Sequence, residues 1–312
     1  MAARKTRSAS STARRAEAVA TGPLGALSHD ELGVIFDGLA DPLEPAVAVA
    51  LSSTCLGLRT PLRAGLEVLK ERHARAAALC RKVHRSHAPC SCALLRDADQ
   101  LMWGDRGLTA DDMATLGMIL RTNGLPRLRV LYLGGNGFGD AGMRALCEGL
   151  GHGAACSLRA LCLYNNKFGP AGAEALVAAL GRGAMPKLKV LRLSHNPVGN
   201  QGIAALAATL RKLPGLKDLY LCYCEIDDEG VASLVAGLGK DDYKALKELE
   251  LTFNPLTDAG CAAIVCSIDA GAMPLLDYVG LARCDSCSDD AKYAVYDAVA
   301  RREARHAGAT QS

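Results

Sequence analysis

The spacing of apolar residues changes once within residues 188–210. Leu191 and Leu193 alternate with other residues, which is the pattern of a strand with one buried face. The apolar positions after Asn196 are Val198, Ile203, Leu206 and Leu210. Their spacing of mostly three to four residues predicts an amphipathic helix. A single unit of strand, turn and helix cannot bury its own apolar face, so the pattern predicts neighbouring copies.

Copies of this unit lie on both sides of it. Five clear copies follow one another at intervals of 28 to 30 residues, and two degraded copies flank them at residues 101–120 and 276–291. The aligned turn residues are Asn136, Asn166, Asn196, Cys224, Asn254 and Cys284. Degraded end copies are typical of solenoids, where they cap the apolar core. The pattern therefore predicts an array of seven repeats over residues 98–300.

The pattern L-x-x-L-x-L-x-x-[N/C], followed by a helix, resembles the leucine-rich repeats. The long period is similar to that of the ribonuclease-inhibitor-like class, which includes RanGAP and NLR proteins. The resemblance implies an α/β solenoid with parallel β-strands on its concave face and helices on its convex face. It also implies that each turn asparagine bonds main-chain groups of neighbouring turns, and that cysteine can take its place. Function does not follow, because solenoids carry many functions on one frame.

Charge narrows the classes of partner. Residues 1–95 hold 13 basic and 8 acidic residues, whereas the rest of the chain holds 23 and 25. The array therefore lacks the strongly basic stripe typical of proteins that bind nucleic acid. No apolar run reaches the roughly 18 residues that suggest a membrane span, so we expect no membrane partner.

Cysteine usage indicates a reducing compartment. The chain holds 13 cysteines, an odd number, and no secretory signal opens it. Several of these cysteines occupy repeat positions that favour a small apolar residue, namely Cys147, Cys261 and Cys266. We expect free thiols and a cytoplasmic or nuclear location.

The segments outside the array differ in composition. Residues 1–23 combine arginine, alanine and serine with few large apolar side chains, which predicts a disordered tail. Their basic residues are also compatible with a nuclear localisation signal or an organelle transit peptide. We expect residues 24–97 to form a helical segment and a linker. Capping and proline signals place the helices over 28–39, 46–55 and 61–82. A second disordered tail is expected at residues 301–312.

The first helix and the segment after it resemble the F-box. The sequence Leu27-Ser-His-Asp-Glu-Leu-Gly-Val-Ile-Phe-Asp-Gly-Leu39 precedes Asp41-Pro42 and Thr54-Cys55-Leu-Gly-Leu58-Arg59. The motif has Pro, Glu and Trp where this chain has Ser28, Asp30 and Leu58. An F-box binds a Skp-type adaptor, which joins a substrate receptor to a cullin ubiquitin ligase. The resemblance implies that the contacts to the adaptor come from Leu27, Ile35, Phe36 and Leu39. The alternative is that these helices only cap the first repeat.

Five soft metal ligands cluster in the linker: Cys80, His84, His87, Cys90 and Cys92. Such a set can hold a tetrahedral Zn²⁺. Its spacing matches no established zinc finger, however, and a polar loop that leaves the long helix is the better interpretation. We expect no metal and no cofactor.

Aromatic residues gather on one predicted face. Strand side chains alternate, so the residues between the inward leucines point to the concave side. Aromatic residues form only 4% of the chain, yet five of its eight tyrosines fall on this face. Exposed tyrosine and arginine are typical of binding hot spots, although any one tyrosine can simply cover the sheet. The residues expected to bind a protein partner are Tyr132, Tyr164, Arg192, His195, Tyr220, Tyr223, Glu250, Phe253 and Tyr278.

The sequence contains no convergent set of catalytic residues or phosphate-binding loop. We therefore expect a monomeric, non-enzymatic interaction protein, with the F-box-like substrate receptor as its most specific role. The alternative is a regulator similar to ribonuclease inhibitor or RanGAP, acting as an inhibitor or a GTPase activator.

Overall fold

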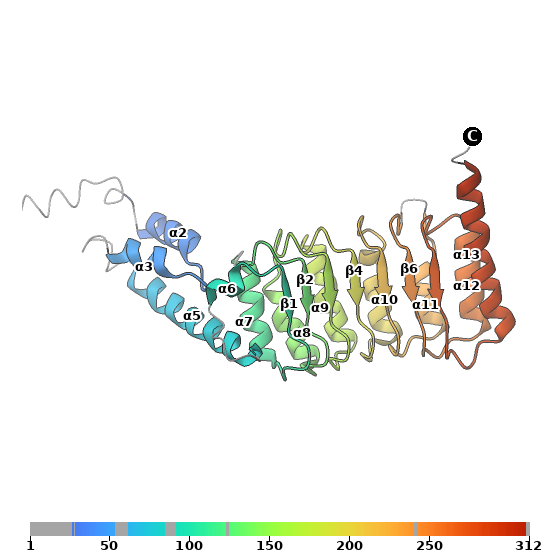
Figure 1. Cartoon of the computed structure of the whole chain (residues 1–312), viewed down its shortest axis with the longest axis horizontal. Coiled ribbons are helices and arrows are strands. Elements are labelled where there is room, and N and C mark those ends of the chain that lie inside the picture. Colours follow the sequence, from blue (N-terminus) through green and yellow to red (C-terminus); the bar gives the residue numbers. More distant parts are fainter. Residues whose placement is uncertain are drawn as a thin grey trace, which may run out of the picture. The chain divides into compact units, whose positions relative to one another are not determined.

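The computed structural model describes residues 27, 29–53, 62–84, 92–122, 125–239 and 242–309 (Figure 1). The predicted basic tail, the F-box-like residues 54–59 and the zinc candidates His87 and Cys90 lie outside these ranges. The chain divides into two compact units, Met1–Leu95 and Arg96–Ser312. This division falls close to the predicted boundary between the helical segment and the array.

The first unit is helical. Its elements are α2 (His29–Leu39), α3 (Ala46–Ser53), α5 (Arg63–Val83) and most of α6 (Cys92–Arg96). Apolar residues recur every four positions along α2, which places them on one face of the helix. The buried core that results contains Leu32, Phe36, Ala40, Ala48, Leu62 and Leu69. The three helices predicted from the sequence are therefore present, with ends that differ by one to two residues.

The described part of the second unit alternates seven short strands with seven helices. The strands are β1 (Gln100–Met102), β2 (Val130–Tyr132), β3 (Ala160–Cys162), β4 (Val190–Arg192), β5 (Asp218–Tyr220), β6 (Glu248–Glu250) and β7 (Tyr278–Gly280). The helices are α7 (Ala110–Arg121), α8 (Gly139–Glu148), α9 (Pro170–Gly181), α10 (Gly199–Leu210), α11 (Asp228–Val235), α12 (Asp258–Asp269) and α13 (Asp289–Ala309). All seven strands pair in parallel and in chain order within one open sheet, which confirms the predicted α/β solenoid.

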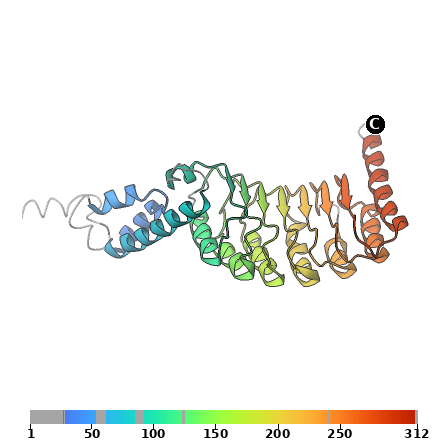
Figure 2. The same ribbon diagram turned by 60° about the horizontal axis from the view of Figure 1, so that its bottom comes forward.

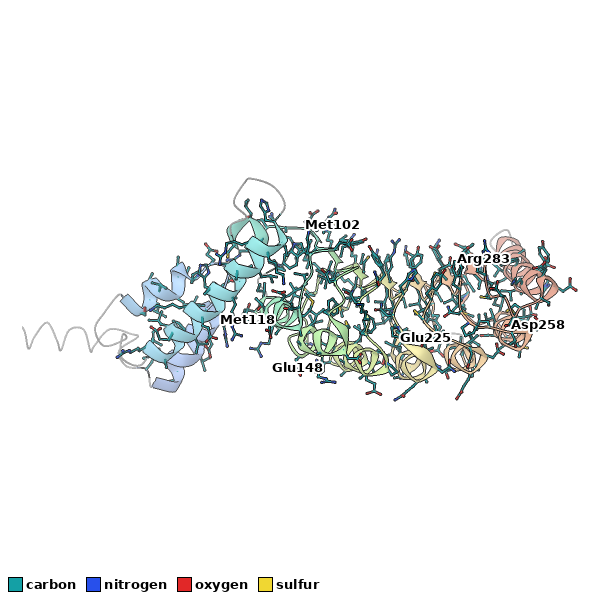
Figure 3. All side chains as sticks on the ribbon, turned by 90° about the horizontal axis from the view of Figure 1, so that it is seen from below. Met102, Met118, Glu148, Glu225, Asp258 and Arg283 are labelled. Carbon is teal, nitrogen blue, oxygen red and sulfur yellow. The ribbon has the colours of Figure 1, made fainter. Side chains whose placement is uncertain are left out.

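The repeat helices cover one side of this sheet and leave its other face open (Figure 2). Met102 and Arg283 lie on the open side near the two ends of the array, whereas Glu148 lies on the helical side (Figure 3). We call the uncovered side the open face; it is the face that the sequence analysis calls concave. None of the described helices has both the length and the apolar character needed to cross a bilayer.

The core of the second unit is a row of aligned apolar side chains. The central residues of successive strands pair in register and are buried, namely Leu101, Leu131, Leu161, Leu191, Leu219, Leu249 and Val279. The residues on either side of each central residue belong to the opposite face, because strand side chains alternate. The period of the sequence therefore determines which residues reach the open face.

A ladder of asparagine side chains joins the turns that follow the strands. Asn254 Oδ1 accepts hydrogen bonds from the main-chain N–H groups of Cys224 and Ile226, while its Nδ2 donates to the carbonyls of Leu221 and Leu251. Three further asparagines bridge neighbouring turns similarly: Asn136, Asn166 and Asn196. This bonding confirms the role expected from the resemblance to the leucine-rich repeats, and it pairs main-chain groups that each strand leaves unpaired where it ends.

Cysteine keeps only part of this bonding. The Cys224 thiol donates to the carbonyls of Leu193 and Cys222, and the Cys284 thiol donates to that of Leu251. Thiols are weak donors and weak acceptors, so cysteine replaces the asparagine amide with weaker bonds. None of the described cysteines in the second unit forms a disulfide, as expected for free thiols.

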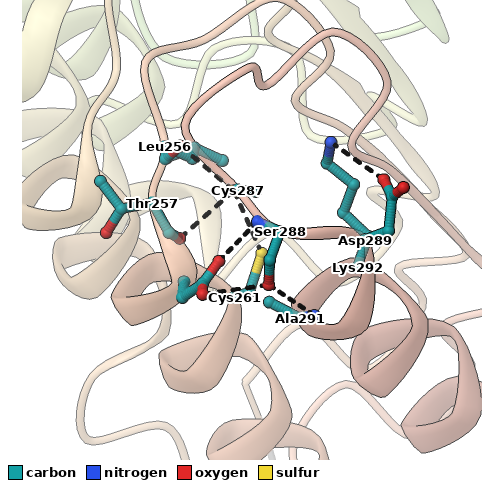
Figure 4. Close-up of polar contacts among 9 residues, drawn as sticks. Leu256, Thr257, Cys261, Cys287, Ser288, Asp289, Ala291 and Lys292 are labelled. Atoms are coloured by element: carbon teal, nitrogen blue, oxygen red, sulfur yellow. Dashed lines mark hydrogen bonds and ion pairs between the residues drawn. The ribbon is translucent and has the colours of Figure 1, made fainter.

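A second set of polar bonds joins the helix N-termini of adjacent repeats. Asp140, Asn200, Asp228 and Asp258 each accept a hydrogen bond from a main-chain N–H at or near the start of the next helix. The last of these bonds anchors the terminal helix: Asp258 accepts from the main chain and the hydroxyl of Ser288, just before α13 (Figure 4). The thiols of Cys261 and Cys287 meet beneath this contact, 3.4 Å apart. These bonds add to the asparagine ladder at the same strand-to-helix turn in four pairs of adjacent repeats.

Two expectations fail in the second unit. Residues 301–309, expected in a disordered tail, continue helix α13 to Ala309. The apolar residues Val295, Ala298 and Val299 and the side chain of Arg302 are buried, so the last helix is held by packing beyond residue 300. Cys266 was assigned to a small apolar core position, but it is exposed on α12, whereas Cys147 and Cys261 are buried.

Replacing Asn254 by alanine will destabilise the solenoid by about 4 kcal/mol, because four buried main-chain groups lose their partners. Cys224→Ala, at the same ladder position one repeat earlier, will cost only about 1 kcal/mol, because it removes weaker thiol bonds. Urea unfolding of both variants provides the measurement. Equal losses would contradict the structural role assigned to the amide.

Candidate functional site

The open face carries the residues that flank the buried strand centres. The position after each central residue holds, in register, Met102, Tyr132, Cys162, Arg192, Tyr220, Glu250 and Gly280. Tyr132, Tyr220 and Glu250 are half-buried there and Arg192 is exposed. The structure thus aligns these candidates along one sheet. Their side chains form three groups of contacts on it.

The first group is a pair of tyrosines near the start of the array. The Tyr132 and Tyr164 hydroxyls are hydrogen-bonded, and their rings meet edge to face at 5.5 Å between centroids. Glycines make room for both rings: a Cβ at Gly104 would lie 2.3 Å from the Tyr132 ring, and one at Gly134 would lie 2.1 Å from the Tyr164 ring. The hydrogen bond from Tyr132 and partial burial raise the pKa of Tyr164 to about 12. The two hydroxyls are therefore held in fixed positions on the open face.

The second group combines charges with a ring at the middle of the array. The Arg192 guanidinium lies over the Tyr220 ring, 4.5 Å from its centroid, and the Tyr220 hydroxyl donates to Glu248 at 2.6 Å. Burial and this bond raise the pKa of Tyr220 to about 12. Asp218 is the partner of Glu248 across β5 and β6. Burial and the negative charge of Glu248 raise the pKa of Asp218. This group holds a cation and two carboxylates around one ring.

The third group is a stack of planar side chains. His195, Tyr223 and Phe253 occupy the same position in three successive repeats, with ring centroids 4.4 Å and 4.1 Å apart and interplanar angles of 25° and 14°. All three have positive φ, at 58°, 52° and 60°. Tyr223 is 42% exposed and Phe253 is 40% exposed. We call these three residues the aromatic stack.

The positive φ of the aromatic stack belongs to the repeat turn. The equivalent residues in the other repeats, Asp105, Gly135, Asn165 and Arg283, also have positive φ. Glycine, asparagine and aspartate tolerate this left-handed conformation, whereas aromatic residues adopt it at a cost. The turn therefore requires the backbone conformation, but it does not require the rings.

The remaining candidates lie near the last strand. Glu250 accepts hydrogen bonds from the main chain and the hydroxyl of Thr252, and its carboxylate lies above Gly280, where a Cβ would come within 1.9 Å. Tyr278 is 49% exposed on β7. Burial, followed by the negative charge of Glu250, raises the pKa of Tyr278. Glu250 and Tyr278 thus extend the candidate face to the end of the sheet.

Sequence reasoning missed two exposed tyrosines on the terminal helix. Tyr293 and Tyr296 lie on α13 with ring centroids 6.3 Å apart. Both are exposed, at 64% and 40%. The two tyrosines are three residues apart, which is a signal for one shared helix face. The alternation that marks the strand face does not extend to a helix, so it cannot reveal these two residues.

The adaptor candidates in the helical unit divide between surface and core. Ile35 and Leu39 are exposed on α2, and Leu27 is half-buried against the core. Phe36 is only 2% exposed, because it shares the inward helix face with Leu32 and Ala40. Phe36 therefore packs in the core of the helical unit and is not part of its surface.

The metal candidates form no cluster within the described residues: no group of three or more His, Cys, Asp or Glu side chains gathers there. Cys80 and Cys92 are buried. The sequence-based zinc hypothesis depends on His87 and Cys90, which lie outside the described ranges.

Removing the Tyr132 hydroxyl in a Tyr132→Phe variant will lower the pKa of Tyr164 from about 12 towards its usual value. The wild-type pKa lies above the roughly 10 of an unfolded chain, so this bond's contribution to stability is complete below pH ~10 and is lost as pH rises through the folded value. NMR titration of isotope-labelled tyrosine measures the shift, with Tyr293→Phe as the control. An unchanged Tyr164 titration would refute the coupling.

Comparison with known proteins agrees with this architecture. A family model described as leucine-rich repeat matches residues 125–147, 184–207, 214–235 and 245–265. A search of curated proteins found no match. A chain of the yeast Rad7–Elc1 complex is 16% identical, with a TM-score of 0.35, over 94% of this chain and 78% of that one. The tropomodulin C-terminal domain of Caenorhabditis elegans is 11% identical, with a TM-score of 0.30, over 77% of this chain and 98% of that one.

Both structural similarities are too distant to support an inference about function. The family match covers four separate segments of the array, and each segment spans parts of one strand–helix unit of the solenoid. The chain thus carries leucine-rich repeats in the matched segments, and these repeats form part of an open, parallel α/β solenoid.

Proposed function

We propose that the solenoid binds a protein partner through the open face of its sheet. The observation that carries this proposal is the aromatic stack, in which His195, Tyr223 and Phe253 adopt positive φ. A left-handed conformation costs roughly 1–2 kcal/mol for residues such as tyrosine and phenylalanine. Core burial does not offset this cost, since Tyr223 and Phe253 remain about two-fifths exposed. Large rigid rings held at a surface in this way are typical of binding hot spots.

The charges beside the aromatic stack suggest the chemistry of the partner. Asp218, Glu248 and Glu250 lie on adjacent strands of the open face, and Arg192 already covers the Tyr220 ring. Like charges on neighbouring strands repel each other, so a cationic group on the partner would relieve the repulsion. A segment with basic residues beside an apolar or aromatic one matches both features.

The competing function is that of a regulator in the ribonuclease-inhibitor-like class, which would act as an inhibitor or as a GTPase activator. Such a regulator would use the same open face, so binding alone does not separate the two functions. Adding the purified chain to its captured partner and measuring the partner's own activity separates them. Inhibition or activation favours the regulator, and an unchanged activity favours a receptor.

Alanine at both Tyr220 and Tyr223 will weaken partner binding by more than about 2 kcal/mol, because it removes two adjacent anchors of the open face. Quantitative capture of partners on immobilised wild-type and variant chains gives the measurement. Arg144→Ala, an exposed residue of α8 on the helical side, is the matched control. Unchanged capture by the double variant would eliminate the open face as the binding site.

A second function, as an F-box-like substrate receptor, is favoured by the surface of the helical unit. Val34, Ile35 and Leu39 are exposed on α2, and Val47 and Val49 are exposed on α3. A helical cap has no need of exposed valines and isoleucine, whereas an adaptor-binding surface does. We propose that Ile35 and Leu39 contact a Skp-type adaptor, with Leu27 at the edge of the contact and Phe36 supporting it from the core.

Co-expression with a Skp-type adaptor will recover a complex that the double variant Ile35→Asp/Leu39→Asp loses, because two carboxylates would be buried in the contact without partners. Lys70→Asp, which introduces one acid at an exposed position of α5, should leave the complex intact. Co-purification followed by size-exclusion chromatography measures both. Failure of the wild-type chain to retain the adaptor would leave the capping role as the better explanation.

A further inference from the structure

A row of basic residues crosses the array directly before its strands. The residue that precedes each strand occupies one repeat position, and its main-chain N–H donates to the carbonyl of the same position one repeat earlier, at 2.7 or 2.8 Å. In chain order, this position holds Asp99, Arg129, Arg159, Lys189, Lys217, Lys247 and Asp277. Five consecutive cations are therefore held in register, with an aspartate at each end. We call these five cations the basic row.

The total charge of the array hides this row. The balance of basic and acidic residues predicts no basic stripe, and the structure corrects that prediction. Neighbouring strands lie roughly 4.8 Å apart, which is closer than the screening length of about 8 Å at physiological salt. Arg129 and Arg159 are exposed, and Lys189 and Lys217 are partly exposed. Their positive charges therefore add to one local field.

Counter-charges are missing along most of the basic row. Lys247 is the exception, because it pairs with Asp277 at the end of the row. Within the described part of the chain, the other four cations form no ion pair. Lys217 is followed directly by a carboxylate, that of Asp218. The uncompensated charge is therefore greatest over the first three members of the row.

The repeat does not require a cation at this position. Asp99 and Asp277 occupy it with the same main-chain bonding. Like charges on neighbouring strands repel each other, so five cations in register are less favourable than a mixture of residues would be. An unfavourable set of like charges at a position free to vary is typical of a surface that meets an oppositely charged partner.

The ion pairs at the ends of the array indicate which anion fits. Lys247 pairs with Asp277, the equivalent residue of the next repeat, at 3.4 Å. Arg127 and Asp97, which are also equivalent residues of adjacent repeats, pair at 3.8 Å. A carboxylate at the position of one repeat thus reaches the cation of its neighbour. Carboxylates of a ligand laid along the basic row would reach its free members in the same way.

Nucleic acid fits the basic row less well. Proteins bind single strands by combining cations with aromatic rings on which the bases stack. The open-face residues that follow the first three cations offer no ring, namely Val130, Ala160 and Val190. The aromatic stack follows the strands, whereas the basic row precedes them. The aspartates at both ends of the row would also repel a longer chain of phosphates.

We propose that the basic row binds an extended acidic segment of a partner protein. Its four free cations span three strand spacings, or about 14 Å, which is about four residues of an extended chain. Acidic side chains at alternate positions of that segment point to one side and pair with the row. The site lies where the strands begin, so it does not depend on the function proposed for the open face.

The test uses the full chain with isotope-labelled valine methyl groups, in low salt, and a blocked peptide in which glutamates alternate with alanines. Binding will shift the resonances of Val130 and Val190, which adjoin the basic row, and not that of Val299 on α13. Added salt will reverse the shifts, because it screens exposed ion pairs. A matched peptide with glutamine for glutamate will cause none. No shift with the glutamate peptide, or equal shifts with both peptides, would overturn the proposal.

A double variant locates the site. Arg159→Gln/Lys189→Gln will weaken the affinity for the glutamate peptide about tenfold, because two ion pairs are lost. Arg144→Gln/Lys167→Gln is the matched control, since it removes the same charge from α8 and from the turn after β3, and it will bind within about twofold of wild type. Thermal melting establishes that both variants are folded. Equal weakening by both would mean a response to net charge alone and would refute the assignment.

A thymidine oligonucleotide of the same charge separates the two kinds of polyanion. It will bind more weakly than the glutamate peptide at the same salt concentration, because the row provides no ring for its bases. Tighter binding of the oligonucleotide that Arg159→Gln/Lys189→Gln abolishes would assign the basic row to nucleic acid, and the acidic-segment proposal would then be wrong.

Discussion

The hydrogen bonds of the asparagine ladder are the constraint on which the solenoid depends. Each strand is only three residues long, so the sheet pairs few main-chain groups, and the turns that follow it must satisfy the rest. Asn166 and Asn196 do so by bonding the turns of adjacent repeats from buried positions. This bonding holds successive repeats at one spacing and in one register. Residues at the same repeat position must therefore lie next to each other in space.

The side chains of the open face follow the same register as the turns. His195, Tyr223 and Phe253 stack about 4 Å apart because the turns that carry them are bonded in step. The pairing of Arg192 with the Tyr220 ring has the same origin, because the two residues are partners across β4 and β5. The repeat dictates where such side chains stand and which backbone conformation they adopt, but it leaves their chemical identity free. A costly residue at a free position is accordingly a stronger indication of function than a leucine at a required one.

The sequence period was sufficient to predict the strands, the helices and the residues of the open face, because each of these follows from spacing. The ladder was expected from the resemblance to the leucine-rich repeats. Contacts between side chains were not predictable in the same way. The pairing of Tyr132 with Tyr164 depends on room above Gly104 and Gly134, which no periodicity reveals. The error at Phe36 arose from a family motif, whereas the four-residue spacing of Leu32, Phe36 and Ala40 indicates the core. The length of the terminal helix was predicted too short, because the residues after 300 are mostly polar and a polar sequence gives no sign that Arg302 is buried.

The hydroxyl and thiol groups of the open face that have shifted pKa values are all shifted towards their neutral forms. Tyrosine hydroxyls are ordinarily neutral at physiological pH. The raised pKa values of Tyr164 and Tyr220, both about 12, extend this neutral, hydrogen-bonding form to higher pH. Burial also raises the pKa of the Cys162 and Cys222 thiols on the same sheet, and a thiol is a far weaker nucleophile than a thiolate. The face therefore offers rings, neutral donors and a few fixed charges held in register. A surface of this kind gains binding energy from shape and charge complementarity, because few of its groups lose conformational freedom when a partner binds.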